Sequence, residues 1–187
     1  MKCTELIMQD HTILRRGLDI LDGMGKKLED GERIEIADVT SLLRFFRVFG
    51  EYHQNMEEKV FFPALCALPA QAPVHVLLSE HVQELMITAE IEEALKSKRG
   101  MSFFQATRRL IALLRTHFDR EDAIFPELTR RWFSKEQDSE VAERLAKIHK
   151  QPEIPVNFSR LECKYVSRRD RAPMPSQRLA RHASAGL

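Results

Sequence analysis

In this chain of 187 residues, a histidine followed four residues later by a glutamate stands shortly before a Phe-Pro step in two places. The first copy, HQNMEEKVFFP, contains His53 and Glu57, and the second, HFDREDAIFP, contains His117 and Glu121. Four residues advance an α-helix by slightly more than one turn, so each pair lies on one helix face, about 6 Å apart along the axis. An imidazole and a carboxylate so placed can bind one metal ion, while the second carboxylate oxygen reaches another ion.

One further histidine precedes each pair along the chain, His11 at a separation of 42 residues and His81 at a separation of 36 residues. A lone histidine in an apolar helical stripe is usually a core or rim residue. Here each of four segments with helical spacing of apolar residues has one histidine in its apolar stripe. Burying polar groups without partners costs on the order of several kcal/mol each. We therefore predict a dinuclear metal site with two bridging glutamates, whose ligands are His11, His53, Glu57, His81, His117 and Glu121.

Helical spacing of apolar residues predicts the elements that position these side chains. A first helix should end near Gly31, and a second should run from an N-cap at Asp38 until Pro63 interrupts it. A third should begin at Pro73, reach Leu95 and be closed by Gly100. Its inward stripe is predicted to contain Leu77, Leu78, His81 and Leu85.

A fourth helix is predicted to open with a capping box formed by Ser102 and Gln105, and a shorter fifth helix should follow. Four amphipathic helices with short connections favour an all-α fold, an up-down-up-down four-helix bundle. We predict the bundle over residues 1–133, the short fifth helix over 134–150 and a flexible tail over 151–187.

The predicted tail is basic, with seven Lys and Arg side chains against three carboxylates, and contains four of the eight prolines. Periodic apolar residues nearly vanish there, which is typical of a solvated extension. A basic tail can also contact nucleic acid or an acidic partner, but it lacks interleaved aromatic residues.

Composition indicates the cellular compartment and argues against two classes of cysteine site. No run of 18 or more apolar residues could cross a membrane, and Glu5, Asp10 and His11 stand where a signal peptide needs apolar residues. The three cysteines form no CxxC pair, so neither a disulfide framework nor a thiolate metal site is predicted. We expect a cytoplasmic protein without membrane contact.

The stretches QDH, EYHQNMEEKVFFP, LLSEH and THFDREDAIFP, in this order, resemble the hemerythrin-like HHE cation-binding family over residues 1 to about 130. The resemblance implies a four-helix bundle that holds a non-haem di-iron centre with two iron ions. Imidazole and carboxylate ligands also suit iron on general grounds, and the ligand types leave zinc and manganese open.

Two positions bear on which branch of the family the chain resembles. Oxygen-carrying hemerythrins have a fifth histidine where this chain has Leu77, and they use an aspartate at the spacing of Asp122. We prefer Glu121 as the ligand because it repeats the offset of Glu57, whereas a five-residue step turns about 140° away from the histidine. Asp122 and Glu58 are then flanking residues or outer hydrogen-bond acceptors.

The ligand set resembles that of family members that handle nitric oxide, repair iron centres or sense oxygen. We therefore expect a protein that binds or senses dioxygen, nitric oxide or peroxide. The alternatives are a di-iron enzyme or iron donor in detoxification or iron-centre repair, and an interaction module with a structural metal. No side chain is an obvious nucleophile, so no catalytic residue is predicted.

Overall fold

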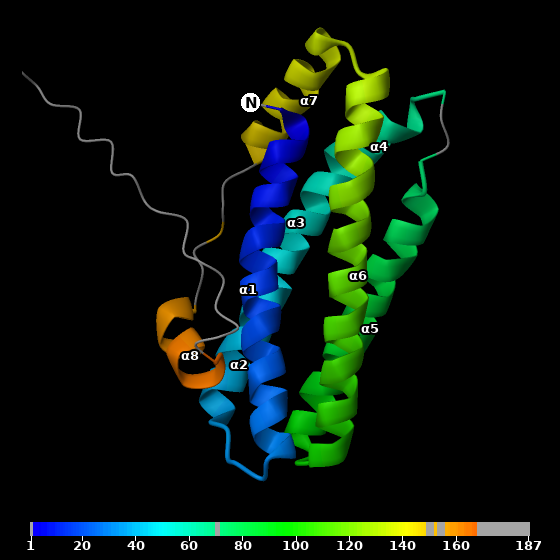
Figure 1. Ribbon diagram of the computed structural model, residues 1–187. Coiled ribbons are helices and arrows are strands. Elements are labelled where there is room, and N and C mark those ends of the chain that lie inside the picture. Colours follow the sequence, from blue (N-terminus) through cyan, green and yellow to red (C-terminus); the bar gives the residue numbers. More distant parts are fainter. Residues whose placement is uncertain (1, 70–71, 149–151, 153–155, 168–187) are drawn as a thin grey trace, which may run out of the picture.

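The computed structural model describes residues 2–69, 72–148, 152 and 156–167, and within them the chain is all-α without strands. Three of the four rods of the bundle are single helices, α1 (Cys3–Glu29), α5 (Val74–Lys96) and α6 (Gly100–Trp132). The other, here called the second rod, spans residues 36–66. Successive rods run in opposite directions (Figure 1), which confirms the predicted up-down-up-down bundle.

The second rod is continuous but not uniformly α-helical. It comprises α2 (Ile36–Phe45), the π-helical turn η1 (Phe46–Gly50), α3 (Glu51–Met56), the π-helical turn η2 (Glu57–Phe61) and α4 (Phe62–Cys66). The predicted interruption at Pro63 is wrong, because Pro63 occupies the first turn of α4, where a missing N–H is tolerated. The predicted N-cap at Asp38 is also wrong, since the rod begins at Ile36.

The connection between α5 and α6 differs from the prediction as well. Gly100 does not close the third helix but begins α6, so Ser102 lies inside the helix and does not cap it. The tight turn is made by residues 97–99, in which Lys98 adopts a positive φ of 54°. The helix end at Trp132 lies beside the predicted domain limit at residue 133, and that limit stays a prediction.

The predicted inward stripe of α5 is partly wrong. Leu77 and His81 are buried, but Leu78 is 39% exposed and Leu85 is 61% exposed. Apolar residues lie all round this helix, so their spacing alone did not show which face packs on the bundle. Glu84 is buried one turn beyond His81 in place of Leu85.

The predicted fifth helix is present as α7 (Lys135–Ile148), and residue 150, its predicted end, lies outside the described residues. The α7 helix packs along α1 and against η2. The backbone N–H of Cys3 donates to Asp138 Oδ1 at 3.0 Å, and Val141 and Leu145 are buried. Among the described residues, every helix is too short or too polar to cross a membrane.

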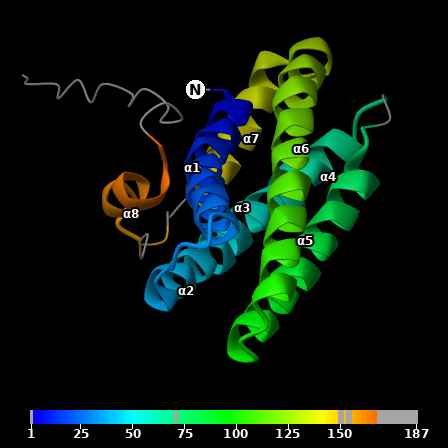
Figure 2. The same cartoon turned by 60° about the horizontal axis from the view of Figure 1, so that its bottom comes forward.

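The prediction that residues 151–187 form a solvated tail is wrong for part of that segment. Residues 158–165 form α8 (Phe158–Tyr165), which lies against α1 and α2, away from α5 and α6 (Figure 2). Phe158, Leu161 and Tyr165 are buried, and the rings of Phe158 and Phe45 meet edge to face at 5.0 Å. Residues 168–187, with much of the basic charge, lie outside the described residues.

Polar contacts also attach α8 to the bundle. The carboxylate of Asp38, which is 2% exposed, accepts hydrogen bonds from Lys164 Nζ at 2.7 Å and Tyr165 Oη at 2.8 Å, and it also pairs with Arg160. Burial alone would raise the pKa of Asp38, but these donors lower it to about 2. The side chain expected to cap α2 therefore anchors α8 instead.

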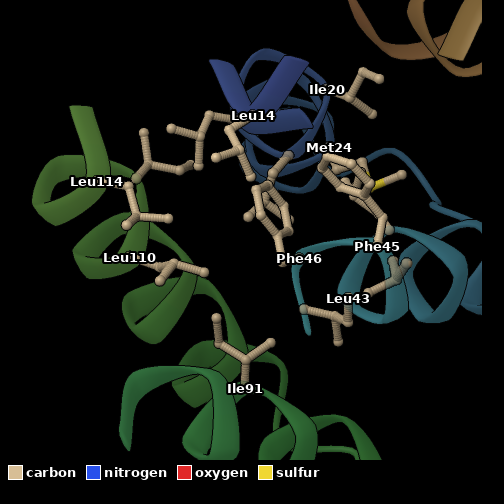
Figure 3. Packing of buried hydrophobic residues seen from close by; sticks show 14 of the residues in the cluster. Leu14, Ile20, Met24, Leu43, Phe45, Phe46, Ile91, Leu110 and Leu114 are labelled. Atoms are coloured by element: carbon tan, nitrogen blue, oxygen red, sulfur yellow. The ribbon is translucent and has the colours of Figure 1, made fainter. Parts of the chain in front are cut away.

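Two apolar clusters fill the bundle along its length. The larger cluster includes residues from all four rods that turn toward one another, as Figure 3 shows for Leu14, Phe46, Ile91 and Leu110. The smaller cluster includes Ile7, Phe61, Leu77 and Phe125. On α1, His11 lies between Ile7 of the smaller cluster and Leu14 of the larger one. The predicted ligands therefore form a polar layer between two apolar regions.

Candidate metal centre

All six predicted ligands lie in this polar layer, and their side chains come from all four rods. His11 belongs to α1, His53 to α3, His81 to α5, and His117 with Glu121 to α6, while Glu57 is the first residue of η2. Each of the six is between 0% and 3% exposed. The structure thus brings together every residue that the sequence nominated, and their role as ligands stays a prediction.

Glu57 lies between two imidazoles from different rods. Its Oε1 is 3.5 Å from Nε2 of His53, four residues earlier in the same rod, and its Oε2 is 3.3 Å from Nε2 of His81. The π-helical turn η2 begins at Glu57, and single π-helical turns are frequent at functional sites. One carboxylate therefore faces a histidine of its own rod and a histidine of α5.

Glu121 occupies the matching position from α6. Its Oε2 is 3.3 Å from Nε2 of His117 and 3.2 Å from Nε2 of His11. His11 Nε2 is also 4.0 Å from Glu57 Oε1, so the two carboxylates share this imidazole as a neighbour. All four histidines turn Nε2 toward the pair of glutamates.

These side chains form two overlapping sets whose potential ligand atoms lie within 4.8 Å of one another: His11, His53, Glu57 and Glu121, and Glu57, His81, His117 and Glu121. Both sets contain both glutamates. Each set has two histidines of its own, from α1 and the second rod in one and from α5 and α6 in the other. The overlap is the arrangement that two metal ions bridged by two carboxylates require.

The chemistry of the donor atoms fits cations in this layer. Buried atoms without a hydrogen-bond partner include Nε2 of His11, His53 and His81, and both carboxylate oxygens of Glu57 and Glu121. Such atoms are costly in a protein interior unless something binds them. Neutral imidazole nitrogens and carboxylate oxygens offer only lone pairs to the middle of the layer, so a positive ion satisfies them and an apolar molecule does not.

The two glutamates also show an electrostatic conflict that a cation would relieve. Burial and the neighbouring Glu57 carboxylate raise the pKa of Glu121 well above its usual range. Burial alone would raise the pKa of Glu57, but His53 and the other imidazoles lower it. Two adjacent buried carboxylates cannot both ionise cheaply, whereas both must be ionised to bridge metal ions.

Each histidine uses its outward nitrogen, Nδ1, to contact a carboxylate on a neighbouring rod. Nδ1 of His11 donates to Asp122 Oδ1 at 2.6 Å, and Arg15 Nη1 donates to Asp122 Oδ2 at 2.7 Å. The corresponding neighbour of His53 is Asp10, whose Oδ2 is 3.7 Å from Nδ1. A proton on Nδ1 leaves the Nε2 lone pair facing the layer, which is the tautomer that a metal ligand needs.

The other two histidines repeat this arrangement. Nδ1 of His81 donates to Glu58 Oε1 at 2.7 Å, and Nδ1 of His117 donates to Glu80 Oε2 at 2.9 Å. Arg120 pairs with Glu80 as Arg15 pairs with Asp122. Burial lowers the pKa of His117 to about 4, so its imidazole is neutral at pH 7.

The four outer carboxylates follow a rule that is visible in the sequence once the structure is known. Each is the chain neighbour of a predicted ligand: Asp10 precedes His11, Glu58 follows Glu57, Glu80 precedes His81, and Asp122 follows Glu121. Each contacts the histidine of the next rod, so the contacts close a ring around the bundle. Asp122 and Glu58 were considered as outer acceptors from sequence, whereas Asp10 and Glu80 were missed.

Aromatic rings form part of the wall of the site. Phe118 stacks on His11 with ring centroids 4.7 Å apart, and Phe62 stacks on His81 at 5.8 Å. These rings restrict rotation of the imidazoles and exclude water from them. Stacking of this kind helps to fix the orientation of His11 and His81.

The Glu121 and Asp122 positions allow a test of the ligand assignment. Glu121→Ala should reduce the number of metal ions bound per chain, because Glu121 belongs to both sets. Asp122→Ala should keep two ions but weaken their affinity by about 10- to 100-fold, since it removes only the acceptor for His11 Nδ1. Elemental analysis and competition with a chelator measure the two effects. Loss of ions in Asp122→Ala with full binding in Glu121→Ala would identify the aspartate as the ligand.

A comparison with known protein families agrees with a cation-binding site in the polar layer. The family profile described as Hemerythrin HHE cation binding domain matches residues 3–128, a range that includes all six predicted ligands and all four rods except the last turn of α6. A search of the curated proteins finds no match to the chain.

Proposed function

Because this chain belongs to the hemerythrin family of HHE cation-binding domains, we propose that it is a non-haem di-iron protein that binds or senses a small molecule. The six buried side chains of the two overlapping sets would hold the two iron ions. Dioxygen, nitric oxide and peroxide are the molecules that such a centre would bind.

The observation that carries this proposal is the convergence of buried donor atoms that lack partners on one layer. Four histidines direct Nε2 toward two glutamates, and both oxygens of each glutamate lack hydrogen-bond partners. A purely structural core would place apolar side chains here, as it does directly above and below the layer. The arrangement therefore supports ion binding as the purpose of the layer.

The surrounding residues define what this site can do. Iron, when bound, supplies a redox-active Lewis acid that binds small oxidants and diatomic molecules. Six protein side chains are too few to saturate two ions of this kind, so positions are left for such a molecule. The outer carboxylates orient the imidazoles, and aromatic rings pack against His11 and His81.

Metal content tests the composition of the centre. Protein purified from iron-replete cells should contain two iron ions per chain, because the two sets share both glutamates. Elemental analysis of the same sample also reports zinc and manganese, which the donor types admit. A constant value of one ion per chain would contradict the dinuclear centre.

Optical spectroscopy distinguishes the proposed role from its alternatives. Reversible change on adding dioxygen or nitric oxide to the reduced protein is expected for a binding or sensing protein. Steady consumption of peroxide or nitric oxide over many turnovers would indicate an enzyme, and transfer of iron to an acceptor protein would indicate a donor. Spectra that respond to none of these molecules would indicate a structural metal.

A further inference from the structure

A small pocket lies beside the polar layer, in the seam between the second rod and α5. Its volume is about 160 Å³, and its lining comprises Phe46, Arg47, Glu51, Gln54, Glu84, Leu85, Thr88, Ala89 and Glu92. Both rods that form it contribute a neighbour of a predicted ligand: Gln54 follows His53, and Glu84 lies one helical turn beyond His81. The pocket therefore includes residues that are close in sequence to two predicted ligands.

Glu84 is the unusual residue of this pocket, because it is a carboxylate that is only 8% exposed. Its Oε2 accepts a hydrogen bond from Gln54 Nε2 at 2.6 Å, and within the described part of the chain it pairs with no Lys or Arg side chain. Burial raises the pKa of Glu84 to about 7. A buried carboxylate that pairs with no Lys or Arg side chain is a group that a passing cation would stabilise.

The second rod leaves space for this carboxylate. Gly50 lies opposite Glu84 at the end of η1, and a Cβ atom placed on Gly50 would be 3.2 Å from Glu84 Oε1. A side chain at this position would therefore press on the carboxylate. The absence of a side chain at Gly50 thus leaves room for the Glu84 carboxylate.

The outer part of the pocket suits a cation as well. Glu51 is exposed at its rim, and Glu92 pairs with Arg47 at 3.7 Å, so the basic side chain at the mouth is itself neutralised. The α5 helix packs far more extensively on α6 than on the second rod. The interface between α5 and the second rod, where the pocket lies, is therefore the less extensive of the two. Carboxylate and amide oxygens along such a seam are suitable ligands for a partly hydrated divalent ion.

We propose that this pocket is the route by which a divalent metal ion enters the centre, and that Glu84 transfers the ion from the rim toward His53 and His81. This inference rests on the proposed metal centre. It assigns Glu84 a positioning role during loading, and Glu84 is not a ligand of the loaded centre. Gln54 holds the carboxylate toward the pocket through the bond at 2.6 Å.

Uptake kinetics of the metal-free full chain test this route. Co²⁺ is a suitable probe, because its visible absorption reports binding without oxidation, and stopped-flow mixing measures the rate. Glu84→Gln keeps the shape and removes the charge, so uptake should slow by about tenfold, as expected when a focusing charge is lost. Glu90→Gln is the matched control, since Glu90 is exposed on the same helix and pairs with Arg109 outside the pocket.

The number of Co²⁺ ions bound at equilibrium distinguishes a failure of the proposed route from a failure of the proposed centre. Two ions per chain at equilibrium in Glu84→Gln, reached slowly, would support the route. Fewer than two in this variant alone would make Glu84 a ligand and overturn the inference, whereas fewer than two in the unmodified chain would contradict the dinuclear centre itself. Equal rates in Glu84→Gln and the unmodified chain, or equal slowing in Glu90→Gln, would also overturn the route.

Gly50→Ala provides a second variant in case Glu84→Gln does not fold. The added methyl group crowds Glu84 Oε1 without changing any charge, and alanine is a better helix former than glycine. Uptake of Co²⁺ should again slow, with two ions bound at the end. An unchanged rate in this variant would show that ions enter elsewhere.

Discussion

Removal of the metal from the full chain should lower its melting temperature by at least about 10 °C, and ferrous iron should restore it. An ion that binds only the folded state, at a thousandfold excess over its dissociation constant, stabilises that state by about 4 kcal/mol. For a chain of this size, that free energy corresponds to about 10 °C or slightly more. Melting curves by circular dichroism, with and without chelator under anaerobic conditions, measure the shift.

The physical reason is that the polar layer is unfavourable without a cation. Glu57 and Glu121 are 0% exposed, and their oxygens lack hydrogen-bond partners, so the metal-free bundle must protonate this layer, hydrate it or loosen. His81→Ala should reduce the difference between the two curves, because His81 belongs to one of the two sets. His75→Ala, at an exposed histidine of the same helix, should leave the difference unchanged. Equal melting of the unmodified chain with and without chelator would contradict a joint buried site.

Deletion of all residues after 150 should also destabilise the protein, by about 3–5 kcal/mol or roughly 10 °C. This expectation follows from α8, whose side chains Phe158, Leu161 and Tyr165 belong to the larger apolar cluster. The deletion also removes Arg160, Lys164 and Tyr165 from the buried carboxylate of Asp38. The loss should appear in both the metal-free and the metal-loaded protein, because α8 contributes no residue to the two ligand sets.

A chain that ends at Ser167 is the control for this deletion, since it keeps α8 and removes only residues 168–187. Melting of the chain that ends at residue 150 at the temperature of the full chain would show that α8 adds nothing to stability. Two metal ions should still bind to both shortened chains. The deletion therefore separates the contribution of α8 to stability from that of the centre.

Gly23→Ala tests the docking of α8 without a deletion. A Cβ atom on Gly23 would lie 2.0 Å from the backbone carbonyl oxygen of Tyr165, so α8 would have to move. Alanine in place of glycine normally stabilises a helix interior by about 1 kcal/mol. A net loss of stability would therefore show that the close approach of α8 outweighs helix propensity, and a net gain would contradict the docking seen here.

Sequence alone determined the features of this protein that depend on local spacing. The offset of four residues from His53 to Glu57, and from His117 to Glu121, places each pair on one helix face wherever the helix packs. Apolar periodicity and the order of the motifs then predicted the existence of the four rods and nominated all six side chains that the structure brings together. None of these inferences required knowledge of which rod lies beside which.

Tertiary structure decided the features that depend on a neighbour from another part of the chain. Apolar residues lie all round α5, so its inward face is set by its packing on α6 and not by its own pattern. As a result Glu84, and not Leu85, is buried. The pairing of Asp10 with His53, and of Glu80 with His117, arises only when adjacent rods meet. The α8 helix is held by α1 and by Asp38, more than a hundred residues away in sequence, and no local pattern within residues 158–165 encodes such partners.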